Sequence, residues 1–530
     1  MATPPQSHAT PAKRKRSLWT IISEQLAEWR VRPLTDYYLI LGIVGLLTIV
    51  GVIMVMSSSM TWSVIDNANV FSTATKQTFM VLAGIVAMIA TMHLNPRSLR
   101  RLAPWALVIT FALLLLVLIP GIGTGREEWG SQSWIVLGPI RLQPSEIARV
   151  VIALWGAHYL ADADPHEDYR TNKLLRFGLV AAAITALIYL EGDTGMSISF
   201  LLVVAVLLIF AGMDFRGIAL LAAFGVLGIV ALLFGGGYRS DRFTVYFDAL
   251  VGHFADTKGI AFQSYQGFLS LSDGSLFGVG LGQSRAKWFY LPEAKNDFIF
   301  AIIGEELGLI GAGLVIFLFG LLGFIGLRTA QRTANQFLAL LAATLTMALV
   351  IQAFINIGYV IGMLPVTGIQ LPLISAGGTS AIITLGAMGM LVTCARYEPQ
   401  AISAMASYGR PAIDKWLFLK EPSLEDCENP AAGSQPRSQE TRAQSKAQAP
   451  RPSAQASRPV LRESADRQRT GGTSSASRRR QRDANLPEQP PRRDSYSAGY
   501  RGSSATNPGD GFSAPARTRR PSVGREEERR

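Results

Sequence analysis

Cysteine is almost absent from the 530-residue sequence, which contains only Cys394 and Cys427. Two cysteines cannot form the disulfide framework that stabilises small secreted domains, and their spacing fits no metal site. The N-terminus also lacks the features of a cleavable signal peptide, because the polar stretch MATPPQSHATPAKRKRS has no adjacent apolar core or cleavage site. We therefore expect a protein without disulfides whose first hydrophobic segment serves as its membrane signal.

Charge is scarce as well. Only 17% of the residues are charged, 49% are hydrophobic, and the apolar residues are gathered into long runs. The first run, YYLILGIVGLLTIVGVIMVM, covers residues 37–56 and has the length that spans a bilayer. This pattern excludes a chain of soluble domains and predicts an integral membrane protein with many spans.

The apolar runs predict an all-α polytopic membrane protein with ten transmembrane helices. The spans are expected near residues 37–57, 77–94, 103–121, 146–162, 174–190, 195–213, 217–235, 298–326, 337–361 and 379–395. Lys and Arg concentrate in the loops after even-numbered spans and at residues 13–16, whereas the short loops on the other side hold only Lys76, Arg126 and Arg141. The positive-inside rule then places both termini in the cytoplasm and a large loop, between spans seven and eight, outside.

Composition divides the chain into three regions, namely a basic cytoplasmic segment (1–36), a ten-span membrane domain (37–398) and a disordered basic cytoplasmic tail (399–530). The N-terminal segment carries 6 basic and 3 acidic residues, and residues 401–530 carry 24 and 15. Such ends suit anionic lipid headgroups or acidic partners and do not indicate a nucleic-acid-binding fold, although a basic tail can also be simply solvated. The acidic patch EPSLEDCEN (421–429) is either a docking site or a solvated stretch.

The eighth span carries three carboxylates near its predicted outer end. Asp297 lies where the large loop meets the apolar run FIFAII, so it is either a partly desolvated general base or the N-cap of the helix. Glu305 lies roughly 12 Å deeper at about 1.5 Å per residue, with Glu306 beside it. Ionisable groups at membrane depth are costly, so these two either meet structural partners inside the bundle or belong to a functional site.

Other polar groups gather at the same predicted side of the membrane. On the fourth span, Glu146 and Arg149 are spaced for an intrahelical ion pair, or Arg149 faces a cavity that holds an anionic substrate. The turn EGDTG (191–195) contributes Asp193. The irregular stretch LPVTGIQLPLISAGGTS (364–380) contains Ser375 and Gly377, and its Ser/Thr end is expected to cap the tenth span.

The large loop that is expected outside the membrane also contains basic candidate site residues. Arg239 and Arg242, in GGGYRSDRF, can bind phosphate or act as interfacial anchors. An outward-facing polar cavity with acids, bases and one large loop fits a transporter or a membrane enzyme that acts on a lipid-linked anionic substrate. Physical chemistry alone leaves these two classes open.

Long motifs resemble those of one family. GVGLGQSRAKWFYLPEAKNDFIFAIIGEELG (278–308) and GMLPVTGIQLPLISAGGTS (362–380) closely resemble the SEDS proteins (shape, elongation, division and sporulation). WIVLGPIRLQPSEIAR (134–149), EGDTG and YRSDR (238–242) support this resemblance, which covers roughly residues 35–398. The ISAGGTS ending and the long basic tail are similar to the division branch of actinobacteria.

The resemblance implies an activity, partners and roles. The family polymerises lipid II into glycan strands at the outer face of the plasma membrane, working with a class B penicillin-binding protein as transpeptidase and with other division proteins. Asp297 is then the catalytic base, and Arg149, Arg239, Arg242 and Lys295 are cations for the pyrophosphate or a sugar acid. A divalent ion (Mg²⁺ or Mn²⁺) is a conceivable aid, but no acidic cluster in the sequence specifies a metal site.

Two departures from the family pattern and three rival functions accompany this hypothesis. Ser133 precedes Trp134 where many relatives have Arg, and Gly192 stands where they have Pro. The rivals are a lipid II flippase, a scaffold that only recruits the transpeptidase, and the elongation counterpart of the same enzyme. The inner half of the spans looks poor in ionisable residues, which favours an enzyme working at the outer face.

Overall fold

The computed structural model describes residues 32–67, 71–126, 130–138, 140–162, 172–234, 246–247, 262–287, 291 and 294–427. All of these residues belong to one compact unit, which ends at Arg442.

Each of the ten predicted spans coincides with a helix. These helices are α2 (Thr35–Asn67), α3 (Ser72–Met92), α4 (Pro96–Val117), α6 (Pro144–Leu160), α7 (Lys173–Leu190), α8 (Thr194–Phe210), α9 (Phe215–Phe234), α12 (Ile299–Arg332), α13 (Gln336–Val360) and α14 (Thr379–Arg396). Within the described residues, α2, α3, α4, α7, α12, α13 and α14 are long and apolar enough to cross a membrane, and α8 is a shorter apolar helix. The chain is therefore a multi-pass membrane protein, and the total of ten crossings stays a prediction.

Local signals in the sequence set several helix starts. Pro96 and Pro144 occupy the first turns of α4 and α6, where a missing N–H costs nothing. The side chains of Asn172 and Asn335 accept hydrogen bonds from the first backbone N–H groups of α7 and α13.

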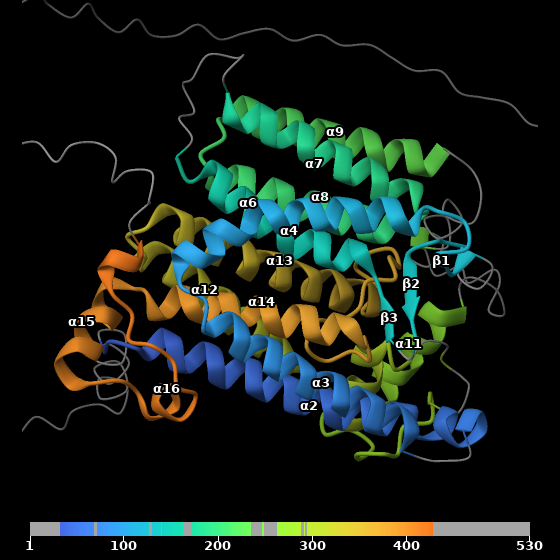
Figure 1. Ribbon diagram of the computed structural model, residues 1–530. Coiled ribbons are helices and arrows are strands. Elements are labelled where there is room, and N and C mark those ends of the chain that lie inside the picture. Colours follow the sequence, from blue (N-terminus) through green and yellow to red (C-terminus); the bar gives the residue numbers. More distant parts are fainter. Residues whose placement is uncertain are drawn as a thin grey trace, which may run out of the picture. The chain divides into compact units, whose positions relative to one another are not determined.

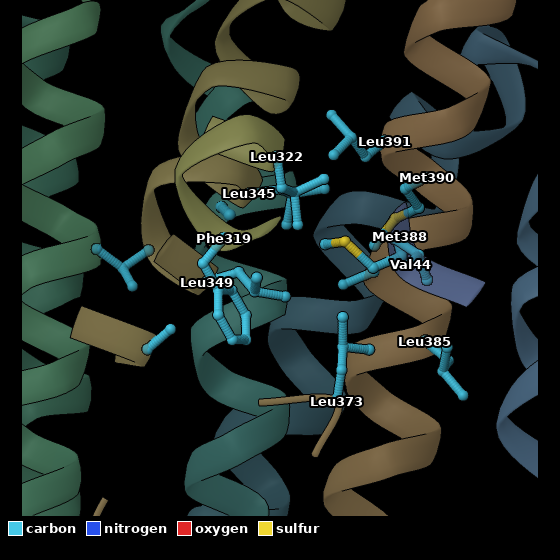
Figure 2. Packing of buried hydrophobic residues seen from close by; sticks show 14 of the residues in the cluster. Val44, Phe319, Leu322, Leu345, Leu349, Leu373, Leu385, Met388, Met390 and Leu391 are labelled. Atoms are coloured by element: carbon cyan, nitrogen blue, oxygen red, sulfur yellow. The ribbon is translucent and has the colours of Figure 1, made fainter. Parts of the chain in front are cut away.

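Most residues of α6, α13 and α14 are buried, as are about half of those of α12, and Figure 1 shows α12 and α14 running beside α13. Figure 2 shows Phe319 and Leu322 of α12 close to Leu345 and Leu349 of α13. Small residues also bring backbones together, since a Cβ on Gly389 of α14 would lie 2.3 Å from a carbonyl oxygen of α3. In a bilayer, such close packing is a main source of helix association.

The fold is not purely helical. Between α4 and α6, strands β1 (Gly123–Thr124), β2 (Trp134–Leu137) and β3 (Ile140–Leu142) form an antiparallel sheet in the order β1-β2-β3. The all-α prediction therefore holds for the bundle, and among the described residues this short connection is the exception. These strands are too short to show a period-2 pattern within a sequence dominated by apolar spans.

The described part of the large loop contains α11 (Phe262–Asp273) and a following segment. The backbone of this segment is hydrogen-bonded to α12 where that helix is broken. Gly308 has φ 66° and ψ −168°, which divides α12 into two helical parts. The N–H groups of Val279 and Gly280 bond to the carbonyl oxygens of Glu305 and Glu306 at 2.9 and 3.1 Å. The loop backbone thus satisfies carbonyls that the break leaves without helical partners.

The folded part of the chain continues beyond the predicted boundary at residue 398. Residues 399–427, here called the C-terminal cap, contain α15 (Pro399–Tyr408), α16 (Ala412–Trp416) and the 3₁₀ turn η1 (Leu424–Cys427). Asp414, in α16, accepts hydrogen bonds from Tyr37 of α2 and Arg396 of α14. Composition alone gave no sign of this, because the buried ion pair joins residues that lie on either side of the expected boundary.

Candidate functional site

The segment just before α12 is fixed through its backbone carbonyls. Ser375 Oγ donates to the carbonyl oxygen of Asn296 at 2.7 Å, and the Ala376 N–H donates to that of Lys295 at 3.0 Å. Asn356 Nδ2 and Tyr359 OH donate to the carbonyl oxygen of Asp297 at 2.8 and 2.9 Å. Three consecutive carbonyls are therefore held by the 369–376 loop and by α13.

Asp297 stands at the end of this clamped segment with a half-buried side chain. The N-cap residue of α12 is Phe298, and no side chain caps that helix start. The N-cap interpretation of Asp297 is therefore wrong. A partly desolvated carboxylate on a fixed backbone, as the sequence predicted, is a suitable geometry for a general base.

The irregular stretch 364–380 holds its own shape by internal contacts. Ser375 Oγ also accepts from the Leu371 N–H at 2.9 Å. A Cβ on Gly377 would lie 2.7 Å from Ser380 Cβ, so a larger residue here would displace the first turn of α14. The predicted Ser/Thr cap of the tenth span is wrong: Gly378 is the N-cap of α14, and Thr379 Oγ1 instead donates to the carbonyl oxygen of Arg141.

Two amide residues of α13 connect this loop to a second cluster. Gln352 and Asn356 lie one turn apart on the same face of the helix. Gln352 Nε2 donates to the carbonyl oxygen of Gln370 at 2.9 Å, and Asn356 Nδ2 donates to that of Ile369 at 2.8 Å. Sequence reasoning missed both residues, although two amides at an i, i+4 spacing within an apolar helix were a signal for an interior polar face.

Arg149 belongs to the second cluster. Its NH1 donates to Gln352 Oε1 at 2.5 Å and to Ser199 Oγ at 2.9 Å, while its buried Nε has no hydrogen-bond partner. Arg149 and Glu146 do not form an ion pair, so the intrahelical interpretation is not supported. The Glu146 carboxyl is buried near Ser380, and its Oε2 has no partner. Unsatisfied buried groups of both signs are typical of a site that binds a polar ligand.

Asp193 is placed by two elements. Its Oδ1 caps α8 by accepting from the Met196 N–H at 2.9 Å, and its Oδ2 accepts from Gln143 Nε2 at 3.0 Å. Gly192 beside it has φ 86°, a conformation that the proline of many relatives cannot adopt. The departure at Gly192 therefore marks a different turn backbone.

Ser133, the other departure from the family pattern, is buried, and its hydroxyl lies 3.2 Å from Ser131 Oγ.

Glu191 is a third residue that sequence reasoning did not single out. It is 2% exposed, and neither carboxyl oxygen has a hydrogen-bond partner. Burial, reinforced by the negative charge of Asp193, raises the pKa of Glu191 to about 9. Glu191 is therefore a neutral acid at pH 7, immediately beside the cluster of Asp193 and Gln143.

Glu305 and Glu306 meet structural partners. Glu305 accepts from Ser284 Oγ at 2.7 Å and from the Arg285 N–H at 2.6 Å. Glu306 accepts from Ser57 Oγ of α2 and lies 3.6 Å from Lys287 Nζ, and both members of this ion pair are buried. These contacts attach the loop after α11 to the break in α12, which favours the structural interpretation of both glutamates.

The remaining predicted residues divide into two groups. The backbone of Lys295 is in the clamped segment, and its side chain is half-buried. Arg239 and Arg242 lie outside the described residues.

In the part of the chain that the structure describes, no three His, Cys, Asp or Glu residues are grouped to hold a metal ion.

Ionisable groups also lie at the predicted inner end of the bundle, just outside the predicted spans. Asp36 is buried, 3.2 Å from Arg328 NH2 and 3.3 Å from Arg332 NH1. Arg396 NH2 lies 2.7 Å from Asp414 Oδ2. Each of these groups lies at or beside a helix end, outside the apolar runs of the sequence. Each is engaged in an ion pair.

The fold and site define a polytopic helical membrane protein with a polar cluster at one end of its bundle. Residues 37–400 match the family model of the FtsW, RodA and SpoVE proteins, described as "Cell cycle protein". The chain belongs to this family. The match confirms the resemblance to SEDS proteins that the motifs indicated.

Individual relatives support this placement. "Probable peptidoglycan glycosyltransferase FtsW" of Mycobacterium tuberculosis is 40% identical over 394 residues, which cover 74% of each chain. "Stage V sporulation protein E" of Bacillus subtilis is 36% identical over 364 residues, covering 68% of this chain and 97% of that protein. The mycobacterial relative agrees with the predicted similarity to the actinobacterial branch.

A solved structure shares the fold. The chain is similar, with a TM-score of 0.55 and 24% identity, to a chain of the structure described as "Structural coordination of polymerization and crosslinking by a peptidoglycan synthase complex". The similarity covers 68% of this chain and 98% of that one.

Proposed function

We propose that this protein is a peptidoglycan glycosyltransferase that polymerises lipid II at the outer face of the plasma membrane during septal wall synthesis. Family membership and two relatives named FtsW support this function. The observation that carries it is the fixed position of Asp297, whose own carbonyl and the two before it are each hydrogen-bonded.

The reaction assigns one step to Asp297. Its carboxylate accepts the proton of the C4 hydroxyl of the acceptor's N-acetylglucosamine while that oxygen attacks the anomeric carbon of the donor chain. The new glycosidic bond forms as the bond to the pyrophosphate oxygen breaks, and undecaprenyl pyrophosphate leaves with both bonding electrons. The proton stays on Asp297 until water or the departing group removes it.

Arg149 supplies positive charge for the leaving group. Its NH1 is held by Ser199 and Gln352, and its Nε is a buried donor without a partner. A guanidinium with a free donor is suited to a pyrophosphate oxygen, because charge develops there in the transition state. Lys295, Arg239 and Arg242 are further candidates for this anion, and Glu146, Asp193, Ser375 and Gly377 line or shape the sugar site.

Partners and location extend the proposal. A class B penicillin-binding protein is the expected transpeptidase partner, in keeping with the fold shared with a chain of a peptidoglycan synthase complex. We place the protein at the division septum, with both termini cytoplasmic and the tail beyond residue 427 available to other division proteins, including the tubulin-like division ring. The mycobacterial relatives named FtsW favour division over elongation.

The test measures two activities of one preparation. Purified protein with its transpeptidase partner is reconstituted in vesicles with fluorescent lipid II, and glycan strands and transbilayer movement of the lipid are followed together. The proposal predicts strands and no protein-dependent movement. Movement without strands, from a folded and partnered protein, would establish the flippase instead.

A further inference from the structure

The C-terminal cap is a fixed part of the bundle. The Asp414 carboxylate is fully buried and accepts from Tyr37 OH at 2.6 Å and from Arg396 NH2 at 2.7 Å. Leu419, also fully buried, packs in the core cluster. Tyr37 opens α2 and Arg396 closes α14, and both helices are long and apolar enough to span a membrane. The cap therefore lies at the level where two spans end, as Figure 1 shows for α15 and α16.

On the surface of the cap, aromatic side chains are exposed, whereas a charged side chain is buried. In α16 the charged Asp414 faces the protein, whereas Trp416 is 78% exposed. Phe418 and Tyr408 are 84% and 89% exposed. Three aromatic side chains this exposed within eleven residues are unusual on a surface in contact with water. Trp and Tyr are the residues that concentrate at membrane–water interfaces.

The charge of residues 408–420 is basic, and the other acids of the cap, Glu421, Glu425 and Asp426, follow this stretch. Between residues 408 and 420, Lys415 and Lys420 are exposed and Arg410 is half-buried. The one acid in this range is Asp414, which is buried and paired with Arg396. Aromatic residues beside unpaired positive charge match the headgroup layer of an anionic leaflet.

We propose that Tyr408, Trp416 and Phe418, together with Lys415 and Lys420, form a membrane-contact surface that binds anionic lipid headgroups of the inner leaflet. This surface fixes the depth and tilt of the cytoplasmic end of the bundle. It is independent of the glycosyltransferase chemistry at the other end of the helices.

The experiment places a probe at the surface. Trp416→Cys is combined with Cys427→Ser, and the introduced thiol is labelled with an environment-sensitive dye in the full-length protein in nanodiscs. The native Cys394 is fully buried, and the Cys427→Ser protein alone controls for any labelling there. Val86→Cys, at a 66% exposed position of α3 in the middle of the predicted span 77–94, is the matched probe within the bilayer. Quenching is compared between headgroup-level lipid spin labels, deep lipid spin labels and aqueous iodide.

The expected result is at least twofold stronger quenching at position 416 by the headgroup-level label than by the deep label or iodide, with the reverse depth preference at position 86. Raising the anionic lipid fraction should enhance this quenching, and Lys415→Gln with Lys420→Gln should remove at least half of that enhancement. Iodide quenching equal to that of a free dye, unchanged by lipid composition, would overturn the proposal. Protection that appears only when a cytoplasmic protein is added would also overturn it, because the surface would then be a protein-docking site.

Discussion

The side-chain amide of Asn356 lies 2.8 Å from the carbonyl oxygen of Asp297 and 2.8 Å from that of Ile369. One amide of α13 thus joins the segment that carries the proposed base to the loop between α13 and α14. Its neighbour one turn earlier, Gln352, contacts both Arg149 and that loop. The base and the proposed pyrophosphate ligand are therefore positioned by the same helix face.

Replacing Asn356 with Leu should lower turnover by roughly 10- to 100-fold, because a misplacement of about 1 Å has an effect of that size. Lipid II polymerisation measures the rate, and co-purification with the partner verifies the fold. Tyr359→Phe is the matched control, since Tyr359 OH reaches the same two carbonyl oxygens and Asn356 remains to hold them. A full rate for Asn356→Leu would show that the amide does not position Asp297.

Arg149→Lys should lower kcat/KM for lipid II by roughly tenfold, since a lysine cannot hold Ser199 and Gln352 while also directing a further donor at an anion. Arg141, an exposed cation of β3, provides the comparison as Arg141→Gln. Equal losses in the two variants would indicate a general electrostatic effect and would remove Arg149 as a specific ligand.

Lys287→Met should destabilise the protein by roughly 3 kcal/mol, because it leaves the buried Glu306 charge without its cation. Thermal melting in detergent detects the loss as a lower Tm. The double variant Lys287→Met with Glu306→Gln removes the charge itself and should recover a large part of the Tm. A double variant less stable than Lys287→Met alone would contradict this account of the pair.

Glu191→Gln should raise stability at pH 8. The pKa of Glu191 is about 9 in the folded protein and near 4.5 when the group is unperturbed, because burial disfavours its charge. Between these values the folded state holds a proton that the unfolded state releases, so stability falls as pH rises from about 4.5 to 9. Glutamine has no proton to lose, and the variant's advantage in Tm should be absent near pH 4 and grow toward pH 8. An unchanged Tm difference across this range would mean that Glu191 titrates normally.

Much of the architecture was predictable from the sequence, and part of the site was as well. Apolar runs located the ten long helices of the described residues, and the motif around Asp297 indicated the segment that the structure shows to be clamped. The partners of Asn356 and Gln352 were not predictable, since they are backbone carbonyls of a distant loop. The cap was missed for a similar reason, because the Asp414–Arg396 pair forms only when residues 18 apart fold back on each other.

The measurement that tests the central claim most directly is lipid II polymerisation by wild type and by Asp297→Asn, each reconstituted with the class B partner. The substitution keeps size and polarity but removes the ability to accept a proton, so both proteins should melt alike and bind the partner equally. The account predicts glycan strands from wild type and at least a hundredfold slower formation from Asp297→Asn. Strands formed at the same rate by a folded, partner-bound Asp297→Asn would contradict it.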